Sequence, residues 1–158
     1  LTKYKGVNRR FEIKHKINNT IFFDDYAHHP SEIKATLESI RFAYTNKRII
    51  AIFQPHLYSR TRDFYKEFGE SLLIADIIVV TDIYPAREKP IKGITSELIV
   101  NIAIKSGHKN VHYIPNKLKL EKELPSLIKE NDLVISLGAG DINKSLDKIY
   151  YNYKRNFK

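Results

Sequence analysis

The sequence contains no cysteine, which excludes a disulfide-stapled scaffold, a zinc site built on thiolates and a cysteine nucleophile. It also contains no methionine and begins at Leu1. Because an intact translation product starts with methionine, we expect the chain to be a piece of a longer protein. No apolar run approaches the roughly 20 residues of a membrane-spanning helix, and the N-terminus lacks the apolar core of a signal peptide. We therefore expect a cytoplasmic protein with no membrane partner.

The residues that are present are those of a soluble globular domain. Hydrophobic residues make up 42% and charged residues 28% of the 158 residues, a length that suits one domain with a core of its own. The net charge is +9. This surplus favours phosphate-bearing ligands, but no basic run alternates with aromatic residues as a strand-stacking surface requires. We therefore expect no nucleic-acid partner.

Strand-like and helix-like segments alternate along the chain. Apolar segments of strand length lie at residues 11–13, 21–23, 48–53, 77–81, 111–114 and 133–137. Segments with helical periodicity lie at residues 30–44, 60–74, 96–105, 117–129 and 141–151, with a kink expected at Pro125. This alternation predicts an α/β, Rossmann-like fold, in which a mostly parallel open sheet carries helices on both faces. We expect one domain over residues 1–158.

In such a sheet, ligands bind beyond the carboxyl ends of the strands, so the loops that follow strands are the places to look for chemistry. The first of these, Asp24–Glu32, reads Asp-Asp-Tyr-Ala-His-His-Pro-Ser-Glu. It offers carboxylates, a phenol and two imidazoles at a helix start, where free N–H groups attract anions. The structural alternative is that the two aspartates cap the turn. The density of ionisable groups favours a binding site.

The second loop, Phe53–Arg62, reads Phe-Gln-Pro-His-Leu-Tyr-Ser-Arg-Thr-Arg and also leads into a helix. Arg60 and Arg62 are unfavourable at a helix start, because the helix dipole prefers acidic residues there. A bound carboxylate or phosphate would resolve this mismatch, since arginine holds either group in a bidentate fork. The alternative for Arg62 is a surface pair with Asp63.

The third loop, Ser136–Ile142, contains a Gly-Ala-Gly turn, which allows a backbone to approach a phosphate closely. The third glycine of a dinucleotide fingerprint is absent, so a nicotinamide-type cofactor is not expected. The sequence also has no Gly-x-x-x-x-Gly-Lys-[Ser/Thr] phosphate loop, so the chain alone lacks the usual means of holding the triphosphate of ATP. No set of histidines and carboxylates has the spacing of metal ligands, and we expect no metal site.

Four segments, in this order, resemble motifs in the C-terminal domain of the Mur ligases, which act in bacterial cell-wall synthesis: Arg9–Glu12, Asp24–Glu32, Phe53–Arg62 and Gly138–Ile142. The likeness runs from about Gly6 to Ser145. It is strongest to the members that add L-alanine to UDP-N-acetylmuramate. The members that recycle murein tripeptide share the Asp-Asp-aromatic-Ala-His-His-Pro element, but the Phe-Gln-Pro-His and Tyr-Ser-Arg-Thr elements favour the alanine-adding branch.

The resemblance implies a three-domain enzyme of which this chain is the last domain. Its missing N-terminal domain would hold UDP-N-acetylmuramate, and its missing central domain would carry the phosphate loop and Mg²⁺. ATP would phosphorylate the substrate carboxylate, and the amine of L-alanine would then displace phosphate from the acyl phosphate. We expect the isolated chain to be inactive.

The resemblance also implies roles for single residues. Arg10 matches an arginine that reaches the ATP phosphates and ribose, and Asp25 an aspartate that helps to fix the ribose. Tyr26 and His28 match positions that line the junction of the nucleotide and the amino acid.

On the alanine side, His56 and Arg60 match residues of the L-alanine subsite, and Arg60 is the best candidate to pair with the carboxylate. Leu57 departs from the family, in which many members have arginine, so the resemblance implies no second guanidinium at that position. Whether Arg62 substitutes for it stays open. Further candidate site residues are His29, Arg62, Gly138 and Gly140.

Two readings outside the enzyme class also stay open. One is a free-standing nucleotide-binding or regulatory module that never joins a ligase. The other is a basic RNA-binding domain, for which binding would depend steeply on salt.

Overall fold

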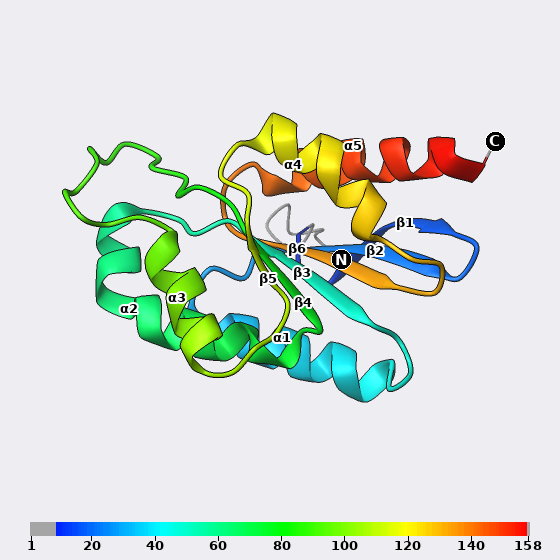
Figure 1. The fold of residues 1–158 in the computed structure, drawn as a ribbon, viewed down its shortest axis with the longest axis horizontal. Helices are drawn as coiled ribbons and strands as arrows, with labels where there is room; N and C mark the ends of the chain where they lie inside the picture. Colours follow the sequence, from blue (N-terminus) through cyan, green and yellow to red (C-terminus); the bar gives the residue numbers. More distant parts are fainter. Residues whose placement is uncertain (1–8, 158) are drawn as a thin grey trace, which may run out of the picture.

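The computed structural model describes residues 9–157, which form a single sheet covered by helices on both faces (Figure 1). Gly6, where the family likeness begins, lies outside the described residues. The strands are β1 (Glu12–Ile17), β2 (Thr20–Asp25), β3 (Ile49–Phe53), β4 (Ile77–Val80), β5 (Val111–Tyr113) and β6 (Leu133–Leu137). The helices are α1 (Pro30–Ala43), α2 (Tyr58–Ser71), α3 (Glu97–Lys105), α4 (Lys117–Glu123) and α5 (Ile142–Lys154).

The strand order is β1-β2-β6-β3-β4-β5. Among the strands of residues 9–157, only β1 pairs antiparallel, through a hairpin with β2, and the other neighbours are parallel. The last strand of the chain, β6, lies in the middle, between β2 and β3. Asp25 of β2 and Phe53 of β3 are both in register with Leu137 of β6, so three strands end level at one edge. The expected mostly parallel α/β sheet is confirmed.

The core lies on both faces of the sheet. Successive side chains of a strand point to opposite faces. In β3, Ile49, Ala51 and Phe53 pack with α1, α2 and α3, whereas Ile50 and Ile52 pack with α4 and α5. Burying one such isoleucine or phenylalanine stabilises the fold by about 1.5–3 kcal/mol. This two-sided burial explains why the strand reads as a continuous apolar run.

Several expected helix boundaries differ from those of the structure. The second helix begins at Tyr58 rather than Arg60, which places Arg60 in its first turn. The segment 117–129 is not one kinked helix: α4 ends at Glu123, and a 3₁₀ turn, Leu124–Leu127, follows. Pro125 lacks the N–H that an α-helix would need there, and its ring clashes with the preceding turn. Among residues 9–157, no helix is long and apolar enough to cross a membrane.

Candidate functional site

The level strand ends bring the three candidate loops together at the carboxyl edge of the sheet. The backbone N–H of Gly138 donates to the Asp25 carbonyl (3.2 Å), and that of Gln54 donates to the Leu137 carbonyl (3.0 Å). The loops after β2, β3 and β6 are therefore joined by main-chain hydrogen bonds. These are the three loops that the sequence indicated as places to look for chemistry, and they lie together because parallel strands present their carboxyl ends at the same edge.

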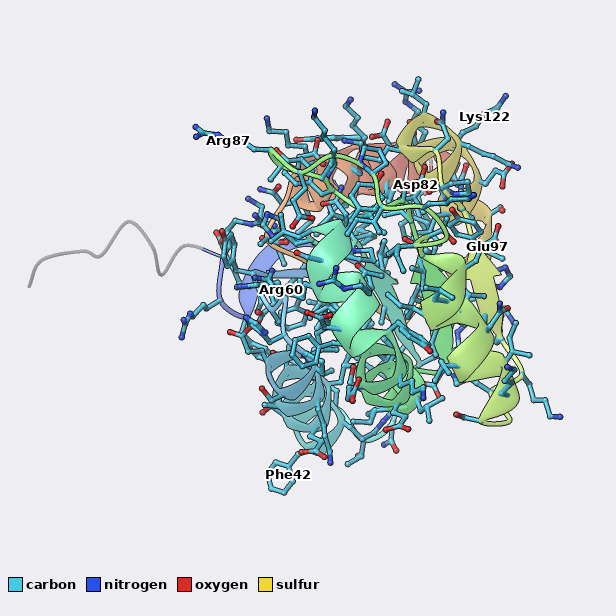
Figure 2. The ribbon with its side chains drawn as sticks, turned by 90° about the vertical axis from the view of Figure 1, so that its left-hand side faces the viewer. Phe42, Arg60, Asp82, Arg87, Glu97 and Lys122 are labelled. Carbon is cyan, nitrogen blue, oxygen red and sulfur yellow. The ribbon has the colours of Figure 1, made fainter. Side chains whose placement is uncertain are left out.

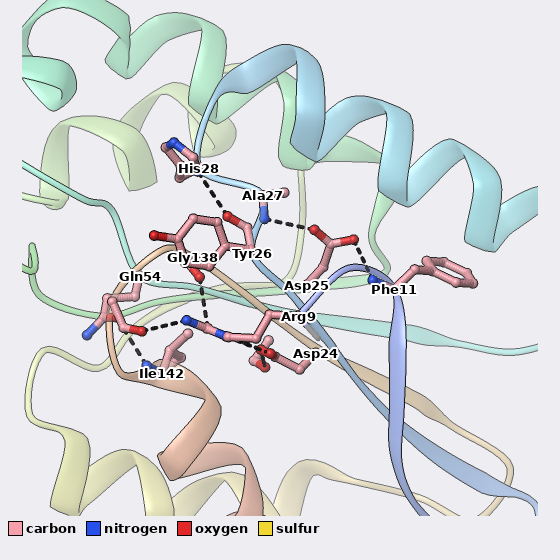
Figure 3. A network of polar contacts seen from close by, with 12 residues as sticks. Arg9, Phe11, Asp24, Asp25, Tyr26, Ala27, His28, Gln54, Gly138 and Ile142 are labelled. Carbon is pink, nitrogen blue, oxygen red and sulfur yellow. Dashed lines mark hydrogen bonds and ion pairs between the residues drawn. The ribbon is translucent and has the colours of Figure 1, made fainter. Parts of the chain in front are cut away.

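Arg9 holds two of these loops together (Figure 3). Its guanidinium donates to the Asp24 carboxylate (2.8 Å) and to the carbonyls of Gly138 (2.9 Å) and Gly140 (2.8 Å). It also lies 5.1 Å from the centre of the Tyr26 ring, within range of a cation–π contact. Asp24 is only 1% exposed, so Arg9 neutralises a buried charge. Arg9 thus holds the first and third loops of the site in place.

Arg9 is not among the site residues expected from the sequence, which include its neighbour Arg10. In the structure Arg10 is exposed. The adjacent pair Arg9-Arg10 was a visible signal, but which arginine points inward depends on how the backbone enters β1. The role of Arg10 toward ATP stays a prediction.

Asp25 is buried, and its carboxylate already has three donors. Oδ1 accepts from the N–H of Ala27 (2.8 Å), while Oδ2 accepts from the N–H of Phe11 (3.0 Å) and the hydroxyl of Thr36 (3.2 Å). Burial raises the pKa of the Asp25 carboxyl, and the hydrogen bonds from Ala27 and Phe11 oppose this rise. Asp25 therefore fixes the loop that carries Tyr26, a residue that is 42% exposed and lies beside Arg9.

The start of α1 is capped by its own loop. Glu32 Oε1 accepts from the N–H groups of His28 (3.3 Å) and His29 (3.0 Å), as in a capping box. Burial disfavours the charged carboxylate, but these hydrogen bonds outweigh it and lower the pKa of Glu32. Burial, and then the nearby charge of Arg60, lower the pKa of His29.

His28, His29 and Glu32 also each place one potential metal-ligand atom within 4.8 Å of the others. The spacing in the sequence did not reveal this cluster. Two observations favour a capping role over cation binding. The Glu32 carboxylate is engaged by two backbone N–H groups, and the cluster lies at the positive end of α1, where the dipole repels a cation.

His56 and Arg60 form a contact pair at the start of α2. The guanidinium Nη1 of Arg60 lies 3.1 Å from Nδ1 of His56. Because arginine only donates, Nδ1 accepts and the proton of a neutral imidazole is on Nε2. Burial, and then the charge of Arg60, lower the pKa of His56 in agreement with the neutral form. The ring of His28 lies 6.2 Å from that of His56, so the first and second loops meet here.

Arg62 has a different environment from Arg60. Its Nε donates to Asp63 (2.9 Å), and both side chains are half-exposed. This is the surface pairing that the sequence analysis named as the alternative. Of the two arginines, Arg60 is the one that contacts a side chain of the candidate site.

The Gly-Ala-Gly turn is shaped by close packing. A Cβ on Gly138 would lie 2.8 Å from the Gln54 carbonyl oxygen, and one on Gly140 would lie 2.6 Å from Cγ of Tyr84. The carbonyls of both glycines point to Arg9. Glycine is therefore needed here because neighbouring loops approach the backbone, and a ligand contact by either residue stays a prediction.

A fourth segment, Tyr84–Glu88, which lies between β4 and α3, also reaches the site. The ring of Tyr84 stacks on that of His56, with centroids 5.7 Å apart and planes at 14°. Glu88 accepts hydrogen bonds from the N–H of Ser59 (3.0 Å) and from its hydroxyl. A carboxylate of the chain itself thus lies at the start of α2, where the sequence analysis expected an anion.

Comparison with known proteins identifies relatives over this whole region. Residues 9–140 match the family model described as Mur ligase, glutamate ligase domain. The UDP-N-acetylmuramate–L-alanine ligases of Salinibacter ruber and Cutibacterium acnes are 46% and 48% identical over 142 and 143 residues. In each case the match covers 90% of this chain but only 30% of the relative. The chain therefore spans less than a third of the length of these relatives.

Solved structures agree with the observed fold. The UDP-N-acetylmuramate–alanine ligase of Thermotoga maritima superposes with a TM-score of 0.77 at 29% identity, covering 94% of this chain and 30% of that one. A single domain from a putative ligase of Haemophilus ducreyi superposes with a TM-score of 0.69 at 23% identity, and the match covers 91% of this chain and 99% of that one. The second structure shows this fold as a separate domain.

Proposed function

The chain belongs to the Mur ligases, and we propose that it is the C-terminal domain of an ATP-dependent ligase that joins L-alanine to UDP-N-acetylmuramate. The observation that carries the proposal is the meeting of His28, His56 and Arg60 at the carboxyl edge of the sheet, in a chain 46–48% identical to alanine-adding relatives. In the longer enzyme, the two domains outside this chain would supply the UDP-N-acetylmuramate site, the phosphate loop and Mg²⁺. We place the reaction in the cytoplasm, where ATP is available.

The alanine side of the site rests on Arg60. Within residues 9–157, the one hydrogen bond of its side chain is to His56. A guanidinium has five N–H donors in a planar fork that matches a carboxylate, so Arg60 can hold His56 and the alanine carboxylate together. His56 would contribute its Nε2–H as a donor. The neutral state of His56 suits this role, because it adds no second positive charge beside the alanine amine, which must lose its proton to attack.

The nucleotide side of the site rests on Tyr26 and its surroundings. Tyr26 presents a half-exposed aromatic ring, and Arg9 orients it through the cation–π contact. An aromatic face and nearby guanidiniums are groups that suit a base and phosphates. Arg10 would reach the phosphates, and His28 would line the junction with the alanine subsite. Asp25 would fix the ribose, in addition to the three donors that it already binds.

ATP supplies the driving force by phosphorylating the substrate carboxylate, and the residues of this chain position the incoming amine. Positioning of this kind can lower a barrier by several kcal/mol, because it removes the entropy cost of bringing the reactants together.

The experiment that tests the proposal uses the complete ligase containing this chain. Phosphate release would be measured with UDP-N-acetylmuramate, ATP and either L-alanine or murein tripeptide. We expect release with L-alanine and at most a trace with tripeptide. Release with tripeptide alone would assign the chain to the recycling branch. Tight ATP binding by the isolated chain, without ligase activity in any longer form, would favour a free-standing nucleotide module.

A further inference from the structure

The N-terminus of α2, which carries Arg60, lacks local capping groups. Its first turn has no acidic residue, and its N-cap position is Leu57, whose side chain cannot accept a hydrogen bond. Leu57 also has φ +73°, in the region that favours glycine. A leucine keeps such a conformation only when its surroundings hold it in place. The start of α2 therefore depends on groups from elsewhere in the chain.

Glu88 provides the missing cap from 29 residues away. Its Oε1 accepts from the N–H of Ser59 (3.0 Å), and its Oε2 accepts from the Ser59 hydroxyl. The side-chain and backbone hydrogen bonds from Ser59 lower the pKa of the Glu88 carboxyl. The N–H of Ser59 is one of the first four of the helix and has no partner within it. Glu88 thus satisfies a donor that α2 itself leaves unpaired.

Tyr84 holds Pro55 and Leu57, which lie in the loop that leads into α2. Its N–H donates to the Pro55 carbonyl (2.8 Å), and its carbonyl accepts from the N–H of Leu57 (2.9 Å). The two segments form a short parallel bridge, and the Tyr84 ring stacks on His56. The same ring packs against Gly140, so it also touches the third loop.

A tight turn joins the two points of attachment. The N–H of Glu88 donates to the Pro85 carbonyl (2.9 Å), and Ala86 has φ +52°. Tyr84 and Glu88 are therefore fixed relative to one another. They contact His56, which directly precedes the strained Leu57, and Ser59, which directly precedes Arg60.

From this geometry we infer that Tyr84–Glu88 is a positioning clamp that sets the His56–Arg60 pair for the alanine carboxylate. The inference rests on the proposed function, and it makes Glu88 a positioning residue that acts through Ser59 and α2. Without the cap, the first turn of α2 frays, and Arg60 loses its fixed orientation toward His56.

The first experiment measures the clamp without reference to catalysis, by hydrogen exchange of the Ser59 amide in the folded chain. We expect Glu88→Ala to speed exchange of this amide by about 5- to 30-fold, the factor for losing the capping hydrogen bond of a helix N-terminus. Glu88→Gln, which keeps the size and one acceptor oxygen, should give a smaller increase. The matched control is Arg87→Ala, because Arg87 is the adjacent residue and extends outward (Figure 2). Equal Ser59 exchange in Glu88→Ala and Arg87→Ala would overturn the inference.

The second experiment measures the Michaelis constants of the complete ligase. We expect Glu88→Ala to raise KM for alanine by about 5- to 30-fold, as for a lost N-cap, and to leave KM for ATP within about twofold. The KM for alanine of Glu88→Gln should lie between those of the wild type and Glu88→Ala. Arg60→Ala is run in parallel. If only Arg60→Ala raises KM for alanine, the clamp does not position the subsite and the inference fails. If neither variant raises it, the assignment of alanine to this loop fails, and the role of the clamp in alanine binding fails with it.

Discussion

Replacing Arg9 with alanine should destabilise the domain more than any other substitution of an arginine near the candidate site. Arg9 is paired with Asp24, which is 1% exposed and also accepts from the hydroxyl of Ser136 (2.7 Å). The same guanidinium donates to the carbonyls of Gly138 and Gly140. The Arg9→Ala variant therefore leaves a buried carboxylate without its cation and two carbonyls without their donor.

The size of the effect follows from these contacts. Removing one partner of a buried ion pair costs about 3–5 kcal/mol, because the other charge stays buried and unpaired. Arg9 itself is 20% exposed and Ser136 still donates to Asp24, so we expect the lower end, about 3 kcal/mol. Domains of this kind are stable by about 5–15 kcal/mol in total. The loss is therefore a large share of the free energy of unfolding.

Equilibrium unfolding of the chain in urea measures this loss. With a slope of about 1–3 kcal/mol per molar, the midpoint should fall by about 1–3 M. Arg10→Ala is the matched control and should change the free energy of unfolding by no more than about 0.5 kcal/mol, because Arg10 is exposed. Adding Asp24→Asn to Arg9→Ala should restore part of the loss, since it removes the unpaired charge. If Arg9→Ala and Arg10→Ala have the same midpoint, the structural role assigned to Arg9 is refuted.

Three further predictions concern other parts of the site. Burial and then the charge of Arg60 lower the pKa of His56 below 6.5, so the unfolded chain takes up the proton at a higher pH than the folded chain. The free energy of unfolding should therefore fall as the pH drops from about 6.5 through the pKa of the folded state. NMR titration should show that the pKa of His56 rises in Arg60→Ala, and an unchanged value would contradict the assigned contact. Gly140→Ala should destabilise the chain by about 1–3 kcal/mol in urea unfolding, because its Cβ would lie 2.6 Å from Cγ of Tyr84. The isolated chain should form no amide and bind ATP weakly in calorimetry, because it has no phosphate loop; sub-micromolar, salt-resistant binding would contradict this.

The sheet and the meeting of its loops could be predicted because they follow from local signals. Ile49–Phe53 and Leu133–Leu137 are short, continuous apolar runs, which is typical of strands buried on both faces. Once such strands are parallel, their following loops must gather at one edge. Choosing Asp24–Glu32 and Phe53–Arg62 as candidate loops therefore required no knowledge of side-chain positions.

The contacts that shape the site could not be predicted in this way. Arg9 and Arg10 are equivalent in the sequence, and only the path of the backbone into β1 makes Arg9 the buried partner of Asp24. The cap of α2 by Glu88 joins residues 29 apart across a loop without periodicity. The sequence did show that the start of α2 needed an anion, but not that the chain supplies one itself.

The central claim is that the chain provides the alanine subsite of an ATP-dependent ligase, and steady-state kinetics of Arg60→Ala in the complete enzyme tests it most directly. Losing a charge-assisted contact costs about 1.5–3 kcal/mol, so KM for alanine should rise by about 10- to 150-fold while KM for ATP stays nearly unchanged. Arg60→Lys should rescue only in part, because it keeps the charge without the planar fork. Asp25→Ala should raise KM for ATP more than KM for alanine. The folding of this variant is checked first, because Asp25 is buried. Values of both constants within about twofold of wild type in Arg60→Ala would contradict the account.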